Sequence, residues 1–282
     1  MLPLVVVSLL WAFSFGLIKR HLAGVDAAFV AAVRLGLALL VLLPFLRPRG
    51  LRPSFALQLV GLGAVQFGLM YVCYIESFRF LRAYEAALFT ITTPLFVTLL
   101  ADALDRTFRP AALAAAALAV AATALVVFRA TELKVTLAGL LLVQASNLCF
   151  ASGQVWYRRL RRAAPDLRDR DVFALPYLGG FVLALAVTAG RDISVELRTP
   201  QLLTLLYLGV IASGLGFFLW NYGAARVSAG TLAVMNNAKV PLAVAVSLVV
   251  FGEQTDLAAL AASLAVMGAA LWLAERPARP SA

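Results

Sequence analysis

The sequence predicts an all-α integral membrane protein in which ten transmembrane helices form two inverted five-helix repeats. The first observation behind this prediction is composition, since 63% of the 282 residues are hydrophobic and 13% are charged. A soluble domain is about 45–50% apolar and about 25% charged, and a chain this poor in charge cannot cover the surface of a water-soluble fold. The second observation is a series of long apolar stretches, and the third is an internal repeat. No long polar stretch remains for a separate soluble catalytic domain.

The apolar stretches are each long enough for a helix to cross the hydrocarbon core of a bilayer. They cover residues 2–18, 26–46, 55–78, 83–104, 110–128, 135–157, 172–189, 200–222, 229–251 and 256–274. Short links with charges, Pro or Gly separate them. Their hydrophobicity is continuous rather than alternating, which excludes a β-barrel, and backbone in lipid must satisfy its own hydrogen bonds. We therefore expect helices throughout.

The distribution of Lys and Arg predicts the orientation. The links after the second, fourth, sixth and eighth stretches, with the C-terminal end, hold 14 of these residues, whereas the other links hold 8. The positive-inside rule assigns the richer set to the cytoplasm. We therefore expect a multi-pass protein of the bacterial cytoplasmic (inner) membrane with both termini cytoplasmic. The net charge of +10 is spread over these links, so a nucleic-acid partner is not expected.

The second half of the chain repeats the first at an offset of 147 residues. The match is clearest where Thr93-Pro94-Leu95 corresponds to Val240-Pro241-Leu242. We predict repeats at 1–129 and 135–275 in one compact bundle. Because each half has five helices, the second enters from the opposite side, and inverted repeats of this kind place a substrate site near the midplane. Pro94 and Pro241 are the expected hinges.

Two cations lie well inside predicted spans, namely Arg34 and Lys239. A charge there costs at least about 2.5–3.5 kcal/mol and normally faces a cavity or a partner. Either residue is a candidate for binding an anionic group of a substrate. The alternatives are a structural ion pair or, for Arg34, a side chain that reaches the interface.

Polar side chains within the spans are further candidates. Gln144 and Asn147 share one face of their predicted helix with Gln154, and Asn236 and Asn237 are adjacent. Amides can donate to and accept from a neutral polar head group. The alternative is hydrogen bonding between helices.

Glu85 is the candidate for proton coupling, because a carboxyl group partly removed from water binds protons more readily. Its alternative role is to complement a helix dipole. Aromatic residues in mid-span form a possible apolar wall for a substrate, or they simply pack. The candidates are Trp11, Phe15, Tyr71 and Trp220.

Signals of an enzyme are weak. Asp102 and Asp105 have the DxxD spacing that membrane prenyltransferases use to bind magnesium diphosphate, but they stand alone. The single histidine, His21, excludes an HExxH zinc site, and no GxxxxGK[ST] loop is present. We expect no metal and no cofactor.

The chain resembles the drug/metabolite transporter superfamily in its EamA-type branch. The resemblance rests on Trp11, Phe15, Lys19, Arg34, Thr93-Pro94-Leu95, Val240-Pro241-Leu242 and Gly252-Glu253. Six strings are also similar to the biotin importers of the YigM type: WAFSF at 11–15, LPFLRPRG at 43–50, LFTITTPL at 88–95, GLLLVQASN at 139–147, WNYGA at 220–224 and AGTLAVMNN at 229–237.

This resemblance implies a secondary transporter that imports biotin, driven by the proton gradient, with no ATPase subunit. Glu85, Asn147, Tyr71, Trp220, Asn236 and Asn237 fall in the matching segments. Lys239 departs from this resemblance, because we expect the biotin importers of this type to have a histidine at the matching position. The main interpretation is therefore biotin import by alternating access, with the small-molecule substrate and the lipid bilayer as partners. The alternatives are an exporter of amino acids or related metabolites, and a membrane enzyme that uses Asp102 and Asp105.

Overall fold

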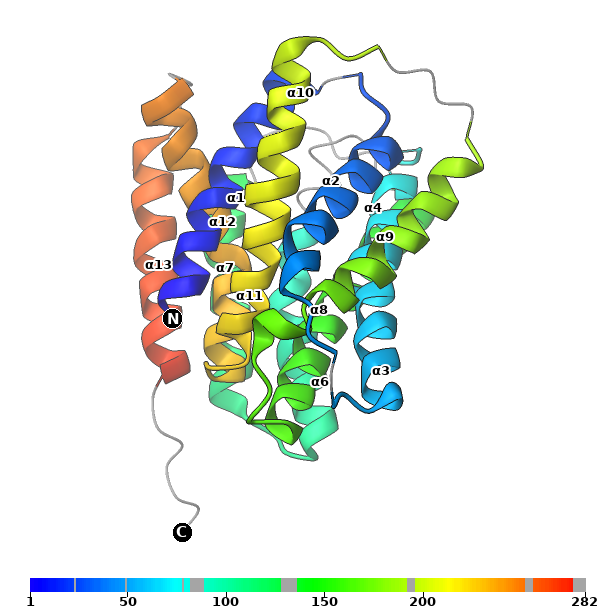
Figure 1. Ribbon diagram of the computed structural model, residues 1–282. Coiled ribbons are helices and arrows are strands. Elements are labelled where there is room, and N and C mark those ends of the chain that lie inside the picture. The colour runs from blue at the N-terminus through cyan, green and yellow to red at the C-terminus, as the bar shows by residue number, and fades with distance from the viewer. Residues whose placement is uncertain are drawn as a thin grey trace.

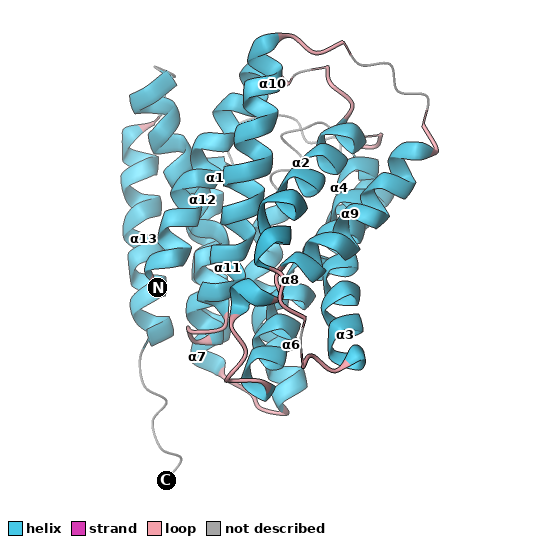
Figure 2. Cartoon of the chain, in the orientation of Figure 1, coloured by secondary structure: helices cyan, strands magenta, loops and turns pink. Residues whose placement is uncertain are grey.

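The structure, a computed structural model, is a bundle of helices (Figure 1). It describes residues 1–22, 24–48, 50–77, 79–81, 89–127, 136–191, 196–251 and 256–275. Within these ranges the regular secondary structure is helical and no strand occurs, as Figure 2 shows. This agrees with the all-α class that the composition predicts.

The first half of the chain contains long helices, short 3₁₀ turns and one π-helical segment. In order they are α1 (Leu2–His21), α2 (Ala27–Leu42), η1 (Leu43–Phe45), α3 (Pro53–Gly63), the π segment η2 (Ala64–Leu69), α4 (Met70–Ser77), η3 (Thr90–Thr92), α6 (Thr93–Asp105) and α7 (Pro110–Val127). Segments α3, η2 and α4 follow one another without a break and form one helical stretch.

The second half has a similar series. It comprises α8 (Leu137–Ala163), η4 (Asp169–Asp171), α9 (Ala174–Ala189), α10 (Thr199–Leu206), the π segment η5 (Tyr207–Leu215), α11 (Gly216–Ala224), α12 (Ala229–Phe251) and α13 (Leu257–Glu275). Here α10, η5 and α11 are continuous. We call the end of the bundle at which α3 begins and α8 ends the lower end, as in Figure 1.

Capping side chains and prolines determine where several helices begin. The side chain of Asp26 accepts a hydrogen bond from the backbone N–H of Phe29 (2.9 Å), and Asp256 accepts one from Ala258 (2.8 Å). These contacts satisfy backbone donors that have no partner inside the helix. Pro53 occupies the first position of its helix, where a missing N–H costs nothing.

The helix boundaries follow the predicted spans closely, with two differences. Helix α8 continues to Ala163, six residues beyond the predicted end at 157, because arginine is a good helix former even outside the apolar region. Helix α6 begins only at Thr93, after the 3₁₀ turn Thr90–Thr92. Part of the predicted span 83–104 lies outside the described residues.

Five helical stretches of the described chain are long and apolar enough to cross a membrane. They are Ala28–Phe45, Pro53–Ser77, Thr199–Ala224, Ala229–Val250 and Leu257–Glu275. Leu2–Ile18, Pro110–Leu125 and Ala174–Ala189 are shorter apolar helices. Helices α6 and α8 are not in this group, α6 because it is short and α8 because it carries amides and arginines. The total of ten spans stays a prediction.

The two halves pack against each other closely. Helix α1 lies on α11 and α12, α2 lies on α9 and η5, and α7 lies on α13. The crossing of α3 and α9 is so tight that it requires glycine. A Cβ atom on Gly63 would lie 1.8 Å from the carbonyl oxygen of Pro176, and one on Gly179 would lie 2.0 Å from that of Val60.

The π segments interrupt regular helical hydrogen bonding at related places. Adding 147 residues to Ala64–Leu69 gives 211–216, which overlaps Tyr207–Leu215. Side chains from other helices bind the carbonyl groups of η5. The Tyr177 hydroxyl donates to Ser213 and Gly214 (both 2.7 Å), and the Trp11 indole donates to Ala212 (2.8 Å). Irregular helical turns of this type are frequent at functional sites.

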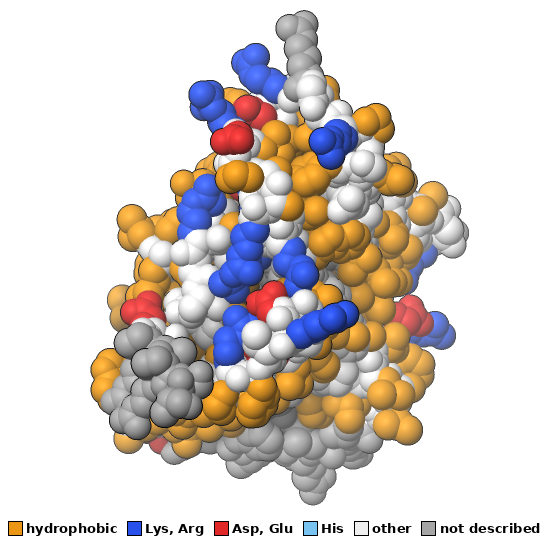
Figure 3. Space-filling view, turned by 90° about the horizontal axis from the view of Figure 1, so that it is seen from below, with side chains coloured by type: hydrophobic (Ala, Val, Ile, Leu, Met, Phe, Trp, Pro, Cys, Tyr) orange, Lys and Arg blue, Asp and Glu red, His pale blue; other side chains and the backbone are white. Residues whose placement is uncertain are grey.

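Figure 3 shows the lower end of the bundle, where charged side chains gather. Lys and Arg side chains gather in the middle of this face, with Asp and Glu among them and hydrophobic side chains around them. Arg159 pairs with Asp105 (3.1 Å) and Arg226 with Asp169 (3.0 Å). An apolar rim around a charged centre is expected where a bundle leaves a bilayer.

We predict that Gly63→Ala lowers the stability of the protein, because the added methyl group collides with the Pro176 backbone. Overpacking typically costs about 1–3 kcal/mol. The thermal unfolding temperature of the detergent-purified variant measures this effect. Gly268→Ala in α13 is the matched control, since a Cβ there meets nothing within 4 Å. An unfolding temperature for Gly63→Ala as high as that of the control would contradict the tight crossing.

Candidate functional site

The ammonium group of Lys239 lies in the middle of the bundle. Lys239 is ten residues from the start of α12 and is partly buried. Its Nζ lies 5.2 Å from the ring centre of Trp11 and 5.7 Å from that of Phe150. These cation–π contacts stabilise the charge without neutralising it. Within the described chain, Lys239 has no carboxylate partner and no hydrogen-bond acceptor, so its charge is available to an anion.

Aromatic rings form one wall beside this ammonium group. The Trp11 ring lies 4.9 Å from that of Trp220, 5.3 Å from that of Phe217 and 6.3 Å from that of Phe150, measured between centroids. Phe67 stacks on Phe217 at 4.7 Å. Trp11 and Trp220 were predicted candidates and lie together here. Phe150 was not predicted, because an isolated phenylalanine in an apolar helix gives no signal.

The second intramembrane cation, Arg34, borders the same π segment. Its Nε donates to the Ser213 hydroxyl (3.0 Å), and its guanidinium lies 5.6 Å from the ring centre of Tyr71. Ser213 directly follows Ala212, whose carbonyl accepts from Trp11. Arg34 and the aromatic wall around Lys239 therefore meet at adjacent residues of η5. Arg34 makes no ion pair within the described residues.

An upper group of amides surrounds a break in the helix before α6. Pro94 has no N–H to donate to the carbonyl oxygen of Thr90. The backbone N–H of Thr93 bonds to that oxygen in a 3₁₀ turn, and not to Phe89 as in an α-helix. The carbonyl oxygen of Phe89 then accepts from the side chains of Asn147 (2.8 Å) and Gln144 (3.3 Å). Both amides therefore have structural partners. The carbonyl oxygen of the Asn147 side chain accepts no hydrogen bond within the described residues.

A lower group of polar side chains joins α8, α11 and α12. Gln154 and Asn236 exchange two hydrogen bonds (3.0 and 3.2 Å), and the indole N–H of Trp220 donates to Gln154 (3.0 Å). All three side chains are buried. We call these three residues the amide bridge. It lies below Lys239, because Lys239 follows Asn236 by nearly one turn of α12.

Two further amides lie at similar depth. Asn237 donates to the carbonyl oxygen of Ile91 (2.7 Å), which joins α12 to the break before α6. Gln66 in η2 donates to Asn221 (3.2 Å), and its own carbonyl oxygen is buried without a partner. Gln66 was missed from the sequence, although it is a polar residue within an apolar stretch, which is a usable signal.

The two predicted hinge prolines lie within the described residues. Pro94 is the second residue of α6, directly after the 3₁₀ turn, and Pro241 lies inside α12. Pro241 interrupts the hydrogen bonding of its helix, and the motion of both prolines as hinges stays a prediction. Glu85 and the side chain of Phe15 lie outside the described residues.

The two carboxylates of the DxxD pattern are already neutralised. Arg109 bonds Asp102 (2.6 Å) and Asp105 (3.0 Å), and Arg159 bonds the second oxygen of Asp105 (3.1 Å). Desolvation lowers the pKa of Arg109, but the hydrogen bonds to both carboxylates raise it above its ordinary value overall. No group of metal-binding side chains occurs among the described residues. This arrangement is a structural ion pair and gives no support to magnesium chemistry.

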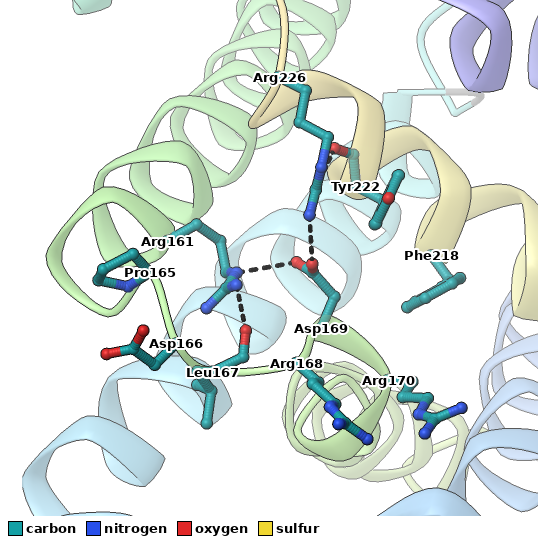
Figure 4. Close-up of a pocket in the computed structure, with 10 residues that line it drawn as sticks. All are labelled: Arg161, Pro165, Asp166, Leu167, Arg168, Asp169, Arg170, Phe218, Tyr222 and Arg226. Atoms are coloured by element: carbon teal, nitrogen blue, oxygen red, sulfur yellow. Dashed lines mark hydrogen bonds and ion pairs between the residues drawn. The ribbon is translucent and has the colours of Figure 1, made fainter.

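A pocket of about 330 Å³ opens at the lower end of the bundle. Figure 4 shows Arg161 and Arg226 pointing toward Asp169 within it. Asp169 bonds Arg161 (2.9 Å), Arg226 (3.0 Å) and the Tyr157 hydroxyl (2.5 Å). Arg161 also donates to the backbone oxygens of Ala164 and Leu167. The two guanidinium groups are thus engaged in joining the α8–α9 connection to α11.

Comparison with known proteins identifies the family. The EamA-like transporter family matches residues 1–128 and again 137–274. A biotin transporter of Salmonella typhimurium is 40% identical over 275 residues, covering 96% of this chain and 91% of the relative. A Pseudomonas aeruginosa protein named probable biotin transporter is 42% identical over 274 residues, with 96% of each chain covered. The biotin transporter of Escherichia coli K12 is 40% identical over 279 residues.

A solved crystal structure has the same fold. It superposes with a TM-score of 0.80 at 22% identity, covering 97% of this chain and 96% of the other. The family matches lie in both halves of the chain, and the relatives extend over nearly its whole length. The chain therefore belongs to the EamA-like transporter family, whose members are membrane transporters and not enzymes.

Proposed function

We propose that this protein imports biotin across the bacterial cytoplasmic membrane by alternating access, driven by the proton gradient. The observation that carries the proposal is the ammonium group of Lys239, which faces aromatic rings in mid-bundle and has no anionic partner in the described chain. The relatives named biotin transporter support this choice of substrate. Biotin is an anion with a hydrophobic body, and both properties fit this position.

Each part of biotin has a possible partner in the bundle. Its carboxylate would bind Lys239, which lies beside Trp11, or Arg34, which lies beside Tyr71. Its apolar ring system and chain would pack on the rings of Trp11 and Phe150. Its ureido group has two N–H donors, and the side-chain oxygen of Asn147 is an acceptor without a partner in the described chain. Tyr71, Trp220, Asn236 and Asn237 complete the proposed binding region.

The proposed topology has ten transmembrane helices in two inverted halves, with both termini in the cytoplasm. The excess of cations in the links at the lower end supports this orientation. Alternating access then requires the amide bridge below Lys239 to open toward the cytoplasm while the outer side closes. Pro94 and Pro241 are the proposed hinges, because Pro94 follows the 3₁₀ turn before α6 and Pro241 removes a hydrogen bond inside α12. No ATPase subunit takes part in this mechanism.

The direct test is growth of a biotin auxotroph that lacks its own biotin importer. Expression of this protein should restore growth at trace biotin, and uptake of radiolabelled biotin should saturate. Unlabelled biotin should compete, whereas amino acids should not. An exporter of amino acids or related metabolites would fail to restore growth and would reduce the accumulation of its own substrate, which would overturn the proposal.

We predict that Lys239→Gln weakens the binding of biotin about tenfold or more, since a hydrogen bond to a charged group contributes about 1.5–3 kcal/mol. Binding of biotin methyl ester, which lacks the carboxylate, should hardly change. Equilibrium binding to the purified protein measures both ligands. Lys239→Arg retains the charge and is the control for folding.

The same pair of ligands distinguishes between the two cations. If Arg34→Gln weakens the binding of biotin but not that of its methyl ester, and Lys239→Gln has no such selective effect, the carboxylate binds Arg34. Equal weakening of both ligands in both variants would mean that neither cation contacts the carboxylate.

We also predict that Glu85→Gln uncouples uptake from the proton gradient. An inward proton gradient should stimulate uptake by the unsubstituted protein, and a protonophore should abolish the stimulation. Glu85→Gln should lose the stimulation but keep biotin exchange at equal pH, because exchange needs no net proton movement. Glu76→Gln is the matched control, since Glu76 is held by Arg79 and Arg191 in a surface ion-pair group. Retained stimulation in Glu85→Gln would exclude this residue as the coupling site.

A further inference from the structure

Arg158 continues the polar face of α8 toward the lower end of the bundle. It lies eleven residues after Asn147, and three turns of an α-helix contain 10.8 residues. The two side chains therefore leave the helix on the same side. Gln154, a member of the amide bridge, lies one turn before Arg158 on this face. Arg158 is thus placed directly below the amide bridge, on the side away from Lys239.

Arg158 has a largely buried side chain and no anionic partner in the described chain. The residue is only 8% exposed, and its Nε makes no hydrogen bond. Neither an ion pair nor any other hydrogen bond of Arg158 occurs within the described chain. Its neighbours on α8 differ in this respect, since Arg159 pairs with Asp105 and Arg161 with Asp169.

The carboxylate of Asp105 is already paired with other arginines. Asp105, whose charge acts on Arg158, uses one oxygen for Arg159 and the other for Arg109. Arg162 lies one helical turn after Arg158 on α8 and is also positive. The charges that neighbour Arg158 on its own helix are therefore cationic, and Asp105 already serves two other arginines.

Such an arrangement costs stability, because a buried charge needs a partner of opposite sign. A hydrophobic residue or a serine at this position would avoid the cost. The cost is offset whenever an anion occupies the position. The transported carboxylate is the one anion that the proposed mechanism brings through this part of the bundle.

On the basis of the transport function proposed above, we propose that Arg158 forms a second binding position for the substrate carboxylate, on the cytoplasmic side of the amide bridge. When Gln154, Asn236 and Trp220 separate, the carboxylate leaves Lys239 and binds Arg158 before it enters the cytoplasm. In the structure described here the bridge is closed, so Arg158 has no partner. Arg158 therefore sets the affinity of the inward-facing state, and Lys239 that of the outward-facing state.

The test compares the two faces of the membrane. Biotin exchange is measured from the outer face in whole cells and from the cytoplasmic face in inverted membrane vesicles, and the half-saturating concentration is determined for each. Arg158→Gln should raise this concentration about tenfold at the cytoplasmic face and leave it unchanged, within twofold, at the outer face. Arg158→Lys should restore most of the cytoplasmic affinity, because it retains the charge. A general structural defect would instead raise the half-saturating concentration at both faces.

Arg162→Gln is the matched control, since Arg162 is an exposed cation one turn further along α8. Arg162→Gln should leave the half-saturating concentration unchanged at both faces. Three results for Arg158→Gln would overturn the role of Arg158 while biotin transport by the unsubstituted protein stands. The half-saturating concentration could change equally at the two faces, change at the outer face alone, or change at neither. Absence of biotin exchange in the unsubstituted protein would overturn the proposed function, and the role of Arg158 with it.

Discussion

In the interior of a membrane protein every backbone N–H and C=O group needs a partner from the protein itself, because lipid offers none. This bundle departs from regular helices at η2, at η5 and before α6, and at each departure it must replace lost hydrogen bonds. Trp11 and Tyr177 bind the carbonyl groups of η5, and Asn147 binds that of Phe89. The irregular turns are thus tied to side chains from distant helices. A movement of one turn must therefore move its partners, which couples the two halves of the chain.

The lack of water and of other partners in the interior also determines how its charged residues interact. Lys239 and Arg34 lie among aromatic rings and hydroxyl groups, which stabilise a cation but leave its charge uncompensated. An anion that enters gains from both the charge and the scarcity of water, since electrostatic interactions strengthen as the dielectric falls. An acidic substrate with an apolar body matches this environment better than a zwitterionic or cationic one.

Polar contacts join the helices below Lys239, in addition to apolar packing. Gln154, Asn236 and Trp220 are buried and hydrogen-bonded to one another, but hydrogen bonds between neutral groups contribute only about 1 kcal/mol each. Such contacts can be exchanged for bonds to water or substrate at little cost. The ion-pair group around Asp169 lies below them and joins the α8–α9 connection to α11. Contacts that are specific yet individually weak suit the repeated opening that the proposed transport mechanism requires.

The sequence alone was sufficient for the helical class, for nearly all helix positions and for the isolated charges. The reason is that a long apolar run in lipid has one regular solution, and a charge within it is visible by inspection. Tertiary structure decided how the amides are used. Asn147 and Asn236 look equivalent in the sequence, yet Asn147 supports the broken helix before α6 and Asn236 joins the amide bridge. The partners of these amides come from other helices, and Phe150 and Arg158 gain their significance only from what surrounds them. Composition and spacing report what a residue can do, whereas packing between helices decides which neighbour it meets.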